Sequence, residues 1–275
     1  MNRLRWLLLG VLIFMVSILV YAWWREMPHD RLKVSFLDVG QGDSILIEAS
    51  NGNQLLIDGG PNKSVLRGLG RHVPWYDRFI DVVVATHPDA DHIGGLPFVL
   101  ERFKVGVVLE PGVATDTNTY QQFRKNVSAE GVANILARRG MKIILDEETT
   151  FTVLYPDRDT TEMESNEASI VGKLEYRGVS FLLTGDAPAK VEQALVYQDG
   201  VRLQSTVLKA GHHGSKTSTS QSLLDLVSPT YAVISAGADN RYGHPHADVV
   251  YRLQRARSTI ISTATSGDVT FYVKK

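Results

Sequence analysis

The feature that most constrains the fold is the point where an apolar run meets a cluster of side chains that bind metals. The run DVVVA, residues 81–85, consists mainly of β-branched residues, as in a buried strand. His87, Asp89, Asp91 and His92 follow at once, within HPDADH. A surface loop with a helix cap would explain Asp91, but not the rest of the cluster. The sequence therefore predicts a site at a strand end.

The composition of this cluster favours a metal centre. If the strand alternation continued, His87, Asp89 and Asp91 would point to one side, and His92 would join them through the following turn. Imidazole and carboxylate together suit zinc, manganese or iron, and the share of carboxylates favours the harder ions. The chain has no cysteine, which excludes disulfides, thiolate metal sites and cysteine nucleophiles.

The N-terminal segment predicts a membrane anchor. Residues 6–24 contain no charge and carry aromatic residues at both ends, and about 20 apolar residues in a helix cross a bilayer core. Arg3 and Arg5 precede the segment, so residues 1–5 are expected in the cytoplasm and the rest of the chain outside it. A cleaved secretory signal is the alternative, and it also exports the domain.

The rest of the chain predicts one large domain of the α+β class. Residues 25–31 form the expected linker and residues 32–275 the domain; the net charge of −1 gives no overall attraction to nucleic acid. Two β-rich halves with helices predict two sheets packed face to face with helices outside. Strands are expected at 33–37, 44–48, 54–57, 79–85, 105–109, 141–145, 151–154, 169–176, 179–184, 205–208, 231–235, 259–262 and 269–273, and helices at 93–103, 120–139, 188–199, 220–226 and 246–255.

Two further strand ends carry candidate ligands. Asp186 ends the run FLLTGD, where it is a metal ligand or a helix cap. His212 and His213 follow another strand, and adjacent residues there project in different directions, so we expect one ligand and one supporting residue and favour His212 as the ligand. Two solvent-facing histidines are the alternative. A phosphate-binding loop is excluded, because Lys216 stands where its second glycine should be.

Together these motifs resemble the metallo-β-lactamase superfamily and, within it, the metallohydrolase domain of the ComEC/Rec2 DNA-uptake family. HPDADH is similar to the superfamily pattern His-x-His-x-Asp-His, with Asp89 in place of the second histidine. The runs FLDVGQGDS, LLIDGG, LLTGD, LKAGHHGS and YGHPH follow in the family's order, from Phe36 to His246. The resemblance implies a four-layer αββα sandwich, preceded here by one transmembrane helix.

The resemblance also implies a site with two divalent metal ions, manganese or zinc. In this reading His87 and Asp89 hold one ion, Asp91 and His92 the other, Asp186 bridges both, and His212 is a further ligand. No histidine lies between His92 and Asp186, so the first ion has oxygen-rich surroundings, which favours manganese. Residues expected to contact the substrate or support the ligands are Asp43, Asp58, Asn166, Ser169, His213, Ser215, Lys216 and Tyr242.

The implied function is hydrolysis of phosphodiesters, with extracellular DNA as the expected substrate. A metal-held hydroxide would attack the phosphorus, with Asp91 orienting it and His244 assisting the leaving oxygen. The family's permease and DNA-binding barrel do not match any part of this chain, so a separately encoded DNA channel is an expected partner. The alternatives are a cell-surface or small-substrate phosphodiesterase and a non-catalytic anchored component of a DNA-uptake assembly.

Overall fold

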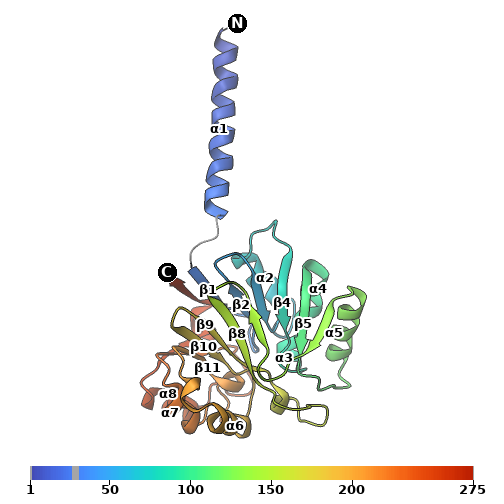
Figure 1. Cartoon of the computed structure of the whole chain (residues 1–275), viewed down its shortest axis with the longest axis vertical. Coiled ribbons are helices and arrows are strands. Elements are labelled where there is room, and N and C mark those ends of the chain that lie inside the picture. Colours follow the sequence, from blue (N-terminus) through green and yellow to red (C-terminus); the bar gives the residue numbers. More distant parts are fainter. Residues whose placement is uncertain (1, 27–30, 275) are drawn as a thin grey trace.

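The computed structural model describes residues 2–26 and 31–274 of the chain (Figure 1). Helix α1, Asn2–Glu26, extends away from the domain that follows it. Among the described residues it is the one helix long and apolar enough to cross a membrane. Residues 27–30, which form most of the predicted linker, lie outside the described residues.

The first sheet has seven strands in the order β14-β1-β2-β3-β4-β5-β6. It opens with the antiparallel meander β1-β2-β3, and β4, β5 and β6 then continue it in parallel. The bounds are β1 Arg31–Phe36, β2 Ile45–Glu48, β3 Gln54–Ile57, β4 Phe79–Val84, β5 Lys104–Glu110, β6 Ala133–Leu136 and β14 Val269–Lys274.

The second sheet also has seven strands, in the order β13-β12-β11-β10-β9-β8-β7. Strands β10 to β13 run parallel, whereas β7, β8 and β9 are antiparallel. The bounds are β7 Lys142–Ile144, β8 Thr149–Tyr155, β9 Val171–Tyr176, β10 Val179–Leu183, β11 Val207–Lys209, β12 Tyr231–Ile234 and β13 Thr259–Ser262.

The two sheets pack face to face, and helices cover both outer faces, which confirms the predicted αββα sandwich (Figure 1). The core between the sheets includes Phe36, Phe151 and Phe181. Alternate residues of β8 are buried, as expected for a strand with one face on a core. The helices are α2 Ser64–His72, α3 Ala90–Ile93, α4 Leu96–Arg102, α5 Asn118–Ala129, α6 Ala189–Asp199, α7 Gln221–Val227, α8 Ala247–Arg255 and α9 Thr263–Ser266, with short 3-10 turns at Asn166–Ala168, Gly200–Leu203 and Gly211–Gly214.

Three predicted elements need correction. The expected helix at 120–139 ends at Ala129, and residues 133–136 form the exposed edge strand β6. The expected helix at 93–103 is two short helices separated by Gly94 and Gly95, whose lack of a Cβ lets the chain pass within contact of Gly59 and Pro61. The last strand, β14, returns to the first sheet beside β1 and so does not extend the second half of the chain.

The direction of the strands places the loops that carry the candidate ligands. The carboxyl ends of β3, β4, β10 and β11 precede Asp58, His87, Asp186 and His213, and the arrows of β4 and β5 point away from α1 in Figure 1. At the opposite end, the turn between β2 and β3 contacts the turn before β8, through Ser50 Oγ and Asp146 Oδ2 at 2.7 Å. Parallel strands bind ligands beyond their carboxyl ends, so the site lies at the end remote from α1.

Candidate metal centre

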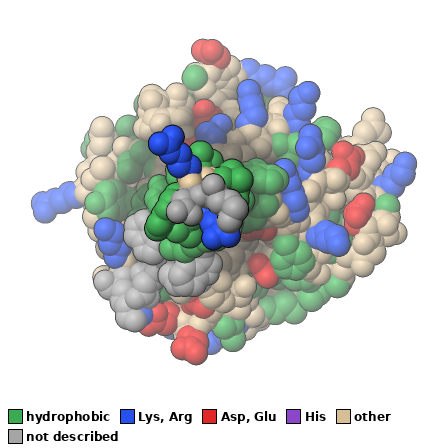
Figure 2. Space-filling view, turned by 90° about the horizontal axis from the view of Figure 1, so that it is seen from above, with side chains coloured by type: hydrophobic (Ala, Val, Ile, Leu, Met, Phe, Trp, Pro, Cys, Tyr) green, Lys and Arg blue, Asp and Glu red, His purple; other side chains and the backbone are tan. Residues whose placement is uncertain are grey.

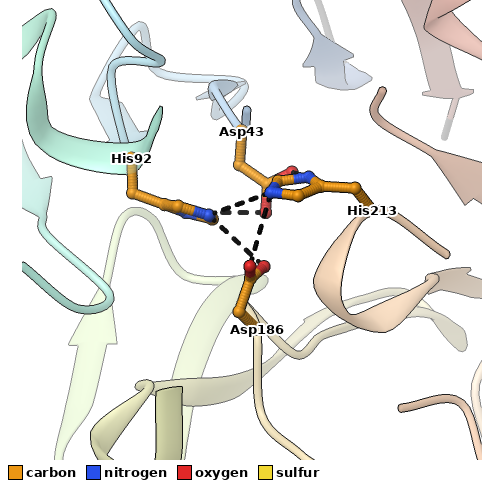
Figure 3. A group of neighbouring side chains, drawn as sticks. All are labelled: Asp43, His92, Asp186 and His213. Carbon is orange, nitrogen blue, oxygen red and sulfur yellow. Dashed lines mark hydrogen bonds and ion pairs between the residues drawn. The ribbon is translucent and has the colours of Figure 1, made fainter. Parts of the chain in front are cut away.

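The centre of the site is a compact group of four buried side chains, Asp43, His92, Asp186 and His213 (Figure 3). Their ligand atoms all lie within 4.8 Å of one another. Asp43 follows β1, His92 lies in α3, Asp186 follows β10, and His213 follows β11. Four segments distant in the sequence therefore meet between the two sheets, with their polar atoms directed inward.

The two histidines of this group share the carboxylate of Asp186, and His213 also contacts Asp91. His92 Nε2 lies 3.3 Å from His213 Nε2 and 3.3 Å from Asp186 Oδ1. His213 Nε2 lies 3.3 Å from Asp186 Oδ2 and 3.3 Å from Asp91 Oδ2. Ligands about 2.0–2.1 Å from a tetrahedral ion are about 3.3 Å apart. The spacing of these atoms therefore fits a divalent ion held between His92, His213, Asp91 and Asp186.

Asp43 faces the other side of the same histidines. Its oxygens lie 3.4 Å from His213 Nδ1 and 3.8 Å from His92 Nδ1, whereas the Nε2 atoms face Asp186. Asp43 Oδ2 is also paired with Lys209 Nζ at 2.5 Å. Although Asp43 belongs to the compact group, its oxygens face the Nδ1 side of the rings, where a carboxylate can support metal-binding histidines.

Behind His92, a second carboxylate orients the imidazole. Asp58 Oδ2 lies 2.7 Å from His92 Nδ1, and Asp58 also accepts hydrogen bonds from the backbone N–H and the hydroxyl of Thr86. All three side chains are buried. The hydrogen bond at Nδ1 leaves Nε2 of His92 directed at the ligand position, which is how metal-binding histidines are commonly held. The structure thus places Asp58, expected to contact the substrate or support the ligands, behind the ring of His92.

Lys209 is a buried cation beside the ligand group. Its Nζ donates to the Gly185 carbonyl at 2.8 Å and lies 3.4 Å from Asp186 Oδ1, in addition to its pair with Asp43. Burial opposes the charge of Lys209, but Asp43 and Asp186 outweigh it and raise the pKa of Lys209 above its ordinary value. Lys209 therefore offsets part of the negative charge that the two carboxylates bring into the core.

The second part of the site contains His87 and Asp89. His87 is buried, its Nδ1 lies 3.0 Å from Thr86 Oγ1, and its Nε2 has no hydrogen-bond partner among the described residues. Asp89 Oδ2 lies 3.7 Å from that Nε2, and Asp89 Oδ1 accepts a hydrogen bond from Ser165 at 2.5 Å. A buried imidazole nitrogen without a partner suits a ligand position. The Asp89 side chain, at 42% exposure, lies at the open side of the site.

Asp91 and His212 complete the wall of the site. Asp91 and His92 belong to helix α3, because the chain leaves the extended conformation at Ala90, and the strand alternation assumed for this cluster does not continue. His212 Nε2 lies 3.6 Å from Asp186 Oδ2, and its Nδ1 lies 3.2 Å from Thr217 Oγ1. Both histidines of the pair therefore approach Asp186, and His213 also reaches His92 and Asp91.

The backbone is strained at the residues that present these side chains. His212 and His213 have positive φ angles of 49° and 54°, and Asp58 has a φ of 59°. Residues other than glycine rarely adopt this region, and such strain concentrates at functional sites. Gly42 has a related role, since a Cβ there would lie 2.1 Å from the Asp91 carbonyl oxygen. The GQGDS loop therefore needs this glycine to pack against the HPDADH loop.

The charges of the ligand group couple to one another. Burial disfavours the charge of Asp186, but His213, His92 and Lys209 outweigh it and hold the pKa of Asp186 well below its ordinary value. Burial opposes protonation of His92 and His213 too, yet Asp186 and the carboxylate behind each ring raise both pKa values well above the ordinary range. Without a metal, both imidazoles therefore hold protons that a metal ion must displace.

The pKa of His87 shifts in the opposite direction. Burial is the largest cause and the charge of His92 the next, and together they hold the pKa of His87 well below its ordinary value. A neutral imidazole has a free lone pair, so His87 is ready to coordinate a metal without losing a proton. The two halves of the site therefore differ in how much protons compete with a metal.

His244 lies at the rim, in the loop after β12. Its ring centroid lies 5.7 Å from that of His212 and 5.7 Å from that of Tyr242, against which it stacks. Its backbone is held by Asn240, which accepts from the His244 N–H and donates to the His244 carbonyl. Burial and the neighbouring histidines lower the pKa of His244 to about 4. His244 is therefore near the ligand group without touching it.

The remaining predicted residues line the surroundings of the site. Ser169 is buried and its Oγ accepts from the Asp186 N–H at 3.3 Å. Asn166 Oδ1 is buried with no hydrogen-bond partner among the described residues. Ser215 is buried and close to Thr217, and Lys216 is exposed beside them. Ser169 is thus placed to hold the Asp186 loop, and Lys216 is placed on the surface.

Lys209, Thr86 and Ser165 contact this group but were not among the predicted site residues. Lys209 had a usable signal, because it is a single lysine in the otherwise apolar strand run VLKAG directly before the two histidines. A buried lysine needs a carboxylate partner. Thr86 and Ser165 carried no such signal, because threonine and serine are common at strand ends and in loops.

Comparison with known proteins connects this geometry to a family. The sequence matches the Metallo-beta-lactamase superfamily over residues 37–238. It is 32% identical over 259 residues to ComE operon protein 3 of Bacillus subtilis (strain 168), covering 88% of this chain and 33% of that protein. It is also 32% identical to Recombination protein 2 of Haemophilus influenzae, over 94% of this chain and 31% of the relative. The chain therefore spans about a third of the length of these relatives.

Solved structures with the same fold have much lower sequence identity. The metallo-beta-lactamase fold protein YhfI from Bacillus subtilis matches with a TM-score of 0.54 at 15% identity, over 87% of this chain and 99% of that one. Zn(2+)-bound PqqB from Methylobacterium extorquens matches with a TM-score of 0.51 at 12% identity, over 84% of this chain and 87% of that one. At these identities the likeness is to the fold alone.

Proposed function

This chain belongs to the metallo-beta-lactamase superfamily, and we propose that it is a metal-dependent phosphodiesterase that cleaves DNA. The relatives that share 32% of its residues include Recombination protein 2 and, over 89% of this chain and 33% of the relative, Competence protein ComA of Neisseria gonorrhoeae. DNA uptake and recombination both bring a protein into contact with phosphodiesters. The hydrolase family and these relatives together support DNA as the substrate class.

The observation that carries the proposal is the spacing of the buried ligand atoms. His92 Nε2, His213 Nε2 and Asp186 lie 3.3 Å apart, with Asp91 3.3 Å from His213. This spacing suits the ligands of one divalent ion, and the unpartnered Nε2 of His87 suits a second. We therefore assign His92, His213 and Asp91 to one ion, His87 and Asp89 to the other, and Asp186 to both, with His212 beside Asp186.

Divalent ions in such a site, manganese or zinc, would lower the pKa of water and neutralise the charge that develops on a phosphodiester. The protein's own residues position the substrate. Asp89 and Asp91, with side chains 42% and 32% exposed, form the open side of the group, so the substrate enters there. Asp91 is placed to orient the attacking water or hydroxide. His244 lies at the rim, where the negative charge of a bound phosphodiester would raise its lowered pKa and allow it to donate a proton to the leaving oxygen.

The location of the enzyme is part of the proposal. Helix α1 is long and apolar enough to span a membrane, and Arg3 and Arg5 precede its apolar run. The excess of positive charge on that side supports a cytoplasmic N-terminus and an extracytoplasmic domain. DNA outside the cell and, at the membrane, a separately encoded DNA channel are then the partners that the competence relatives suggest.

The test compares turnover of single-stranded DNA, duplex DNA and a chromogenic diester by the full chain with matched manganese or zinc. Asp186→Ala and Asp91→Ala are expected to lose on the order of a thousandfold in rate. Asp225→Ala, which removes an exposed carboxylate of α7, is the control and should retain the rate. Turnover by Asp186→Ala equal to that of the unchanged chain would contradict the proposal.

Two other results would assign a different function. Cleavage of the chromogenic diester without cleavage of either DNA would indicate a small-substrate or cell-surface phosphodiesterase. Absence of both bound metal and turnover in the folded protein would indicate a non-catalytic component of an assembly.

A further inference from the structure

One end of the domain carries an exposed patch of aromatic and basic side chains that the metal centre does not use. We define the basal patch as Trp75, Tyr76, Arg78, Arg102 and Lys104. Trp75 is 81% exposed and Tyr76 48% exposed, and the two rings pack edge to face 5.8 Å apart. The three cations are exposed as well. Large aromatic rings left in water together with cations are typical of an interaction surface.

The strand register places the basal patch at the same end of the first sheet as the start of the domain. Lys33 pairs with Glu48 and Glu48 with Gln54, and the Gln54 N–H reaches the side chain of Asp81 in β4. These contacts place Lys33 of β1 level with Asp81 of β4 across the sheet. Two residues earlier in each strand, Arg31 is therefore level with Phe79. Phe79 pairs with Lys104. Arg31, Phe79 and Lys104 are therefore level, and the loop with Trp75 and Tyr76 precedes Phe79.

The chain between α1 and β1 keeps this end close to the end of α1. Glu26 and Arg31 are five residues apart, and five Cα steps reach at most about 18 Å. Neighbouring strands are about 4.8 Å apart, so β4 and β5 lie about 14–19 Å to the side of β1. If α1 spans a bilayer, the basal patch lies within reach of the surface of that bilayer.

The chemistry of the patch matches that surface. Tryptophan and tyrosine favour the headgroup level of a bilayer, and arginine and lysine are attracted to anionic headgroups. Figure 2, viewed from the side of α1, shows Lys and Arg side chains along the side where β4 and β5 lie in Figure 1. Among the described residues, neither Arg102 nor Lys104 forms an ion pair with a carboxylate. Their charge is therefore available to phosphate.

We propose that the basal patch docks on the anionic headgroups of the bilayer that α1 spans, with Trp75 and Tyr76 inserted among them. This inference rests on the membrane anchoring included in the proposed function. Docking at this end would fix the domain upright, since α1 alone leaves it free to tilt. The metal centre, at the carboxyl ends of β4 and β10, then opens away from the membrane. The substrate approaches from the aqueous side.

The absence of cysteine allows a direct test by single-site spin labelling of the full chain in vesicles. Pro74→Cys places the label next to Trp75, and Ala114→Cys places a matched control in the exposed loop after β5, at the site end. In vesicles of phosphatidylcholine with phosphatidylglycerol, the Pro74 label should collide more with oxygen and less with a water-soluble nickel chelate. The Ala114 label should stay accessible to the chelate.

Variants in the Pro74→Cys background separate the contributions of the rings and the charges. Trp75→Ser should return the label to the chelate accessibility of the Ala114 control. Arg102→Gln and Lys104→Gln should each weaken docking about fivefold, and vesicles of phosphatidylcholine alone should reproduce the loss. DNA cleavage should be unchanged in these variants, because the basal patch lies at the end remote from the metal centre.

Three results would overturn the proposal. In the first, the protein floats with the vesicles while the Pro74 and Ala114 labels are equally accessible to the chelate. In the second, the Pro74 label is protected from oxygen as well as from the chelate, which would indicate contact with protein. In the third, the protein does not float with the vesicles at all, which also removes the anchor but leaves the nuclease proposal to its own assay.

Discussion

The metal centre has two halves, which differ in how firmly neighbouring residues hold the candidate ligands. We call the half with His92 and His213 the tight half and the half with His87 and Asp89 the open half. His92 and His213 are buried, each with a carboxylate behind its ring, and Lys209 balances the charge nearby. Among the described residues, the hydrogen-bond partner behind the ring of His87 is the Thr86 hydroxyl, and the Asp89 side chain beside it is 42% exposed. If both halves hold ions as proposed, we expect the half with His92 to bind its ion tightly and the half with His87 to exchange its ion readily.

The largest difference between variants is expected when His212 or His213 is replaced. His213 Nε2 contacts Asp91, Asp186 and His92, whereas among the described carboxylates His212 Nε2 approaches Asp186 alone, at 3.6 Å. We expect His213→Ala to lose on the order of a thousandfold in turnover, and His212→Ala to lose about tenfold. Turnover and bound metal per chain are the measurements. Equal losses in the two variants, or a larger loss in His212→Ala, would show that the ligand assignment is wrong.

Replacement of Lys209 tests whether its charge stabilises the buried carboxylates of the tight half. Lys209→Met leaves Asp43 and Asp186 buried without the cation, and the loss of one partner of a buried ion pair costs about 3–5 kcal/mol of stability. Urea denaturation of the metal-free chain measures this loss. Lys190→Met, at a surface pair with Glu167 in which the lysine is 77% exposed, is the control and should cost about 1 kcal/mol or less. Two variants of equal stability would show that Lys209 has no such role.

Asp58 tests the orientation of His92. Asp58→Asn keeps the size of the side chain but weakens its hydrogen bond to His92 Nδ1. The metal affinity of the tight half should fall about 10–100-fold while the fold persists. Isothermal titration with manganese or zinc, beside circular dichroism as the control for folding, checks this expectation. Unchanged metal affinity would show that Asp58 does not orient His92 for metal binding.

The smallest effect is expected in the open half. Asp89→Ala removes an exposed side chain that also accepts from Ser165. We expect the metal concentration for half-maximal turnover to rise about tenfold, with the maximal rate recovered at saturating metal. A loss of rate that excess metal does not restore would show that Asp89 acts on the substrate and not on the ion.

Much of the fold was predictable because apolar strand runs mark the buried strands directly. The run at 54–57 coincides with the buried strand β3, and the run at 179–184 differs by one residue from β10, whose second half is buried. The missed elements lack that signal: β6 is exposed along its whole length, and α2 contains Gly68 and Gly70, which weaken its helical pattern. Because β6 has no buried face, its sequence shows no strand pattern, and the helix before it was predicted to continue through it.

The candidate site was predictable to the level of motifs and not of atoms. HPDADH and LLTGD identified His92 and Asp186, which the structure brings to 3.3 Å. The choice between His212 and His213 depends on two consecutive residues with positive φ, and no sequence pattern gives that geometry. The pairing of Asp43 with Lys209 joins residues 166 positions apart, so only the assembled sheets reveal it.

The pH dependence of metal binding follows from the difference between the halves. The raised pKa values of His92 and His213 mean that both rings hold protons in the metal-free chain, so binding must release them. Affinity in this half should therefore fall as the pH falls. His87, with its lowered pKa, should add little to this dependence. Calorimetry in buffers of different ionisation enthalpy counts the protons released.

The most direct test of the two-half metal centre is calorimetric titration of the metal-free full chain with manganese and with zinc. We predict two steps of unequal affinity, in which the tighter step releases protons and disappears in His213→Ala while the weaker step persists. A single class of sites that releases no protons and survives His213→Ala would contradict the central claim.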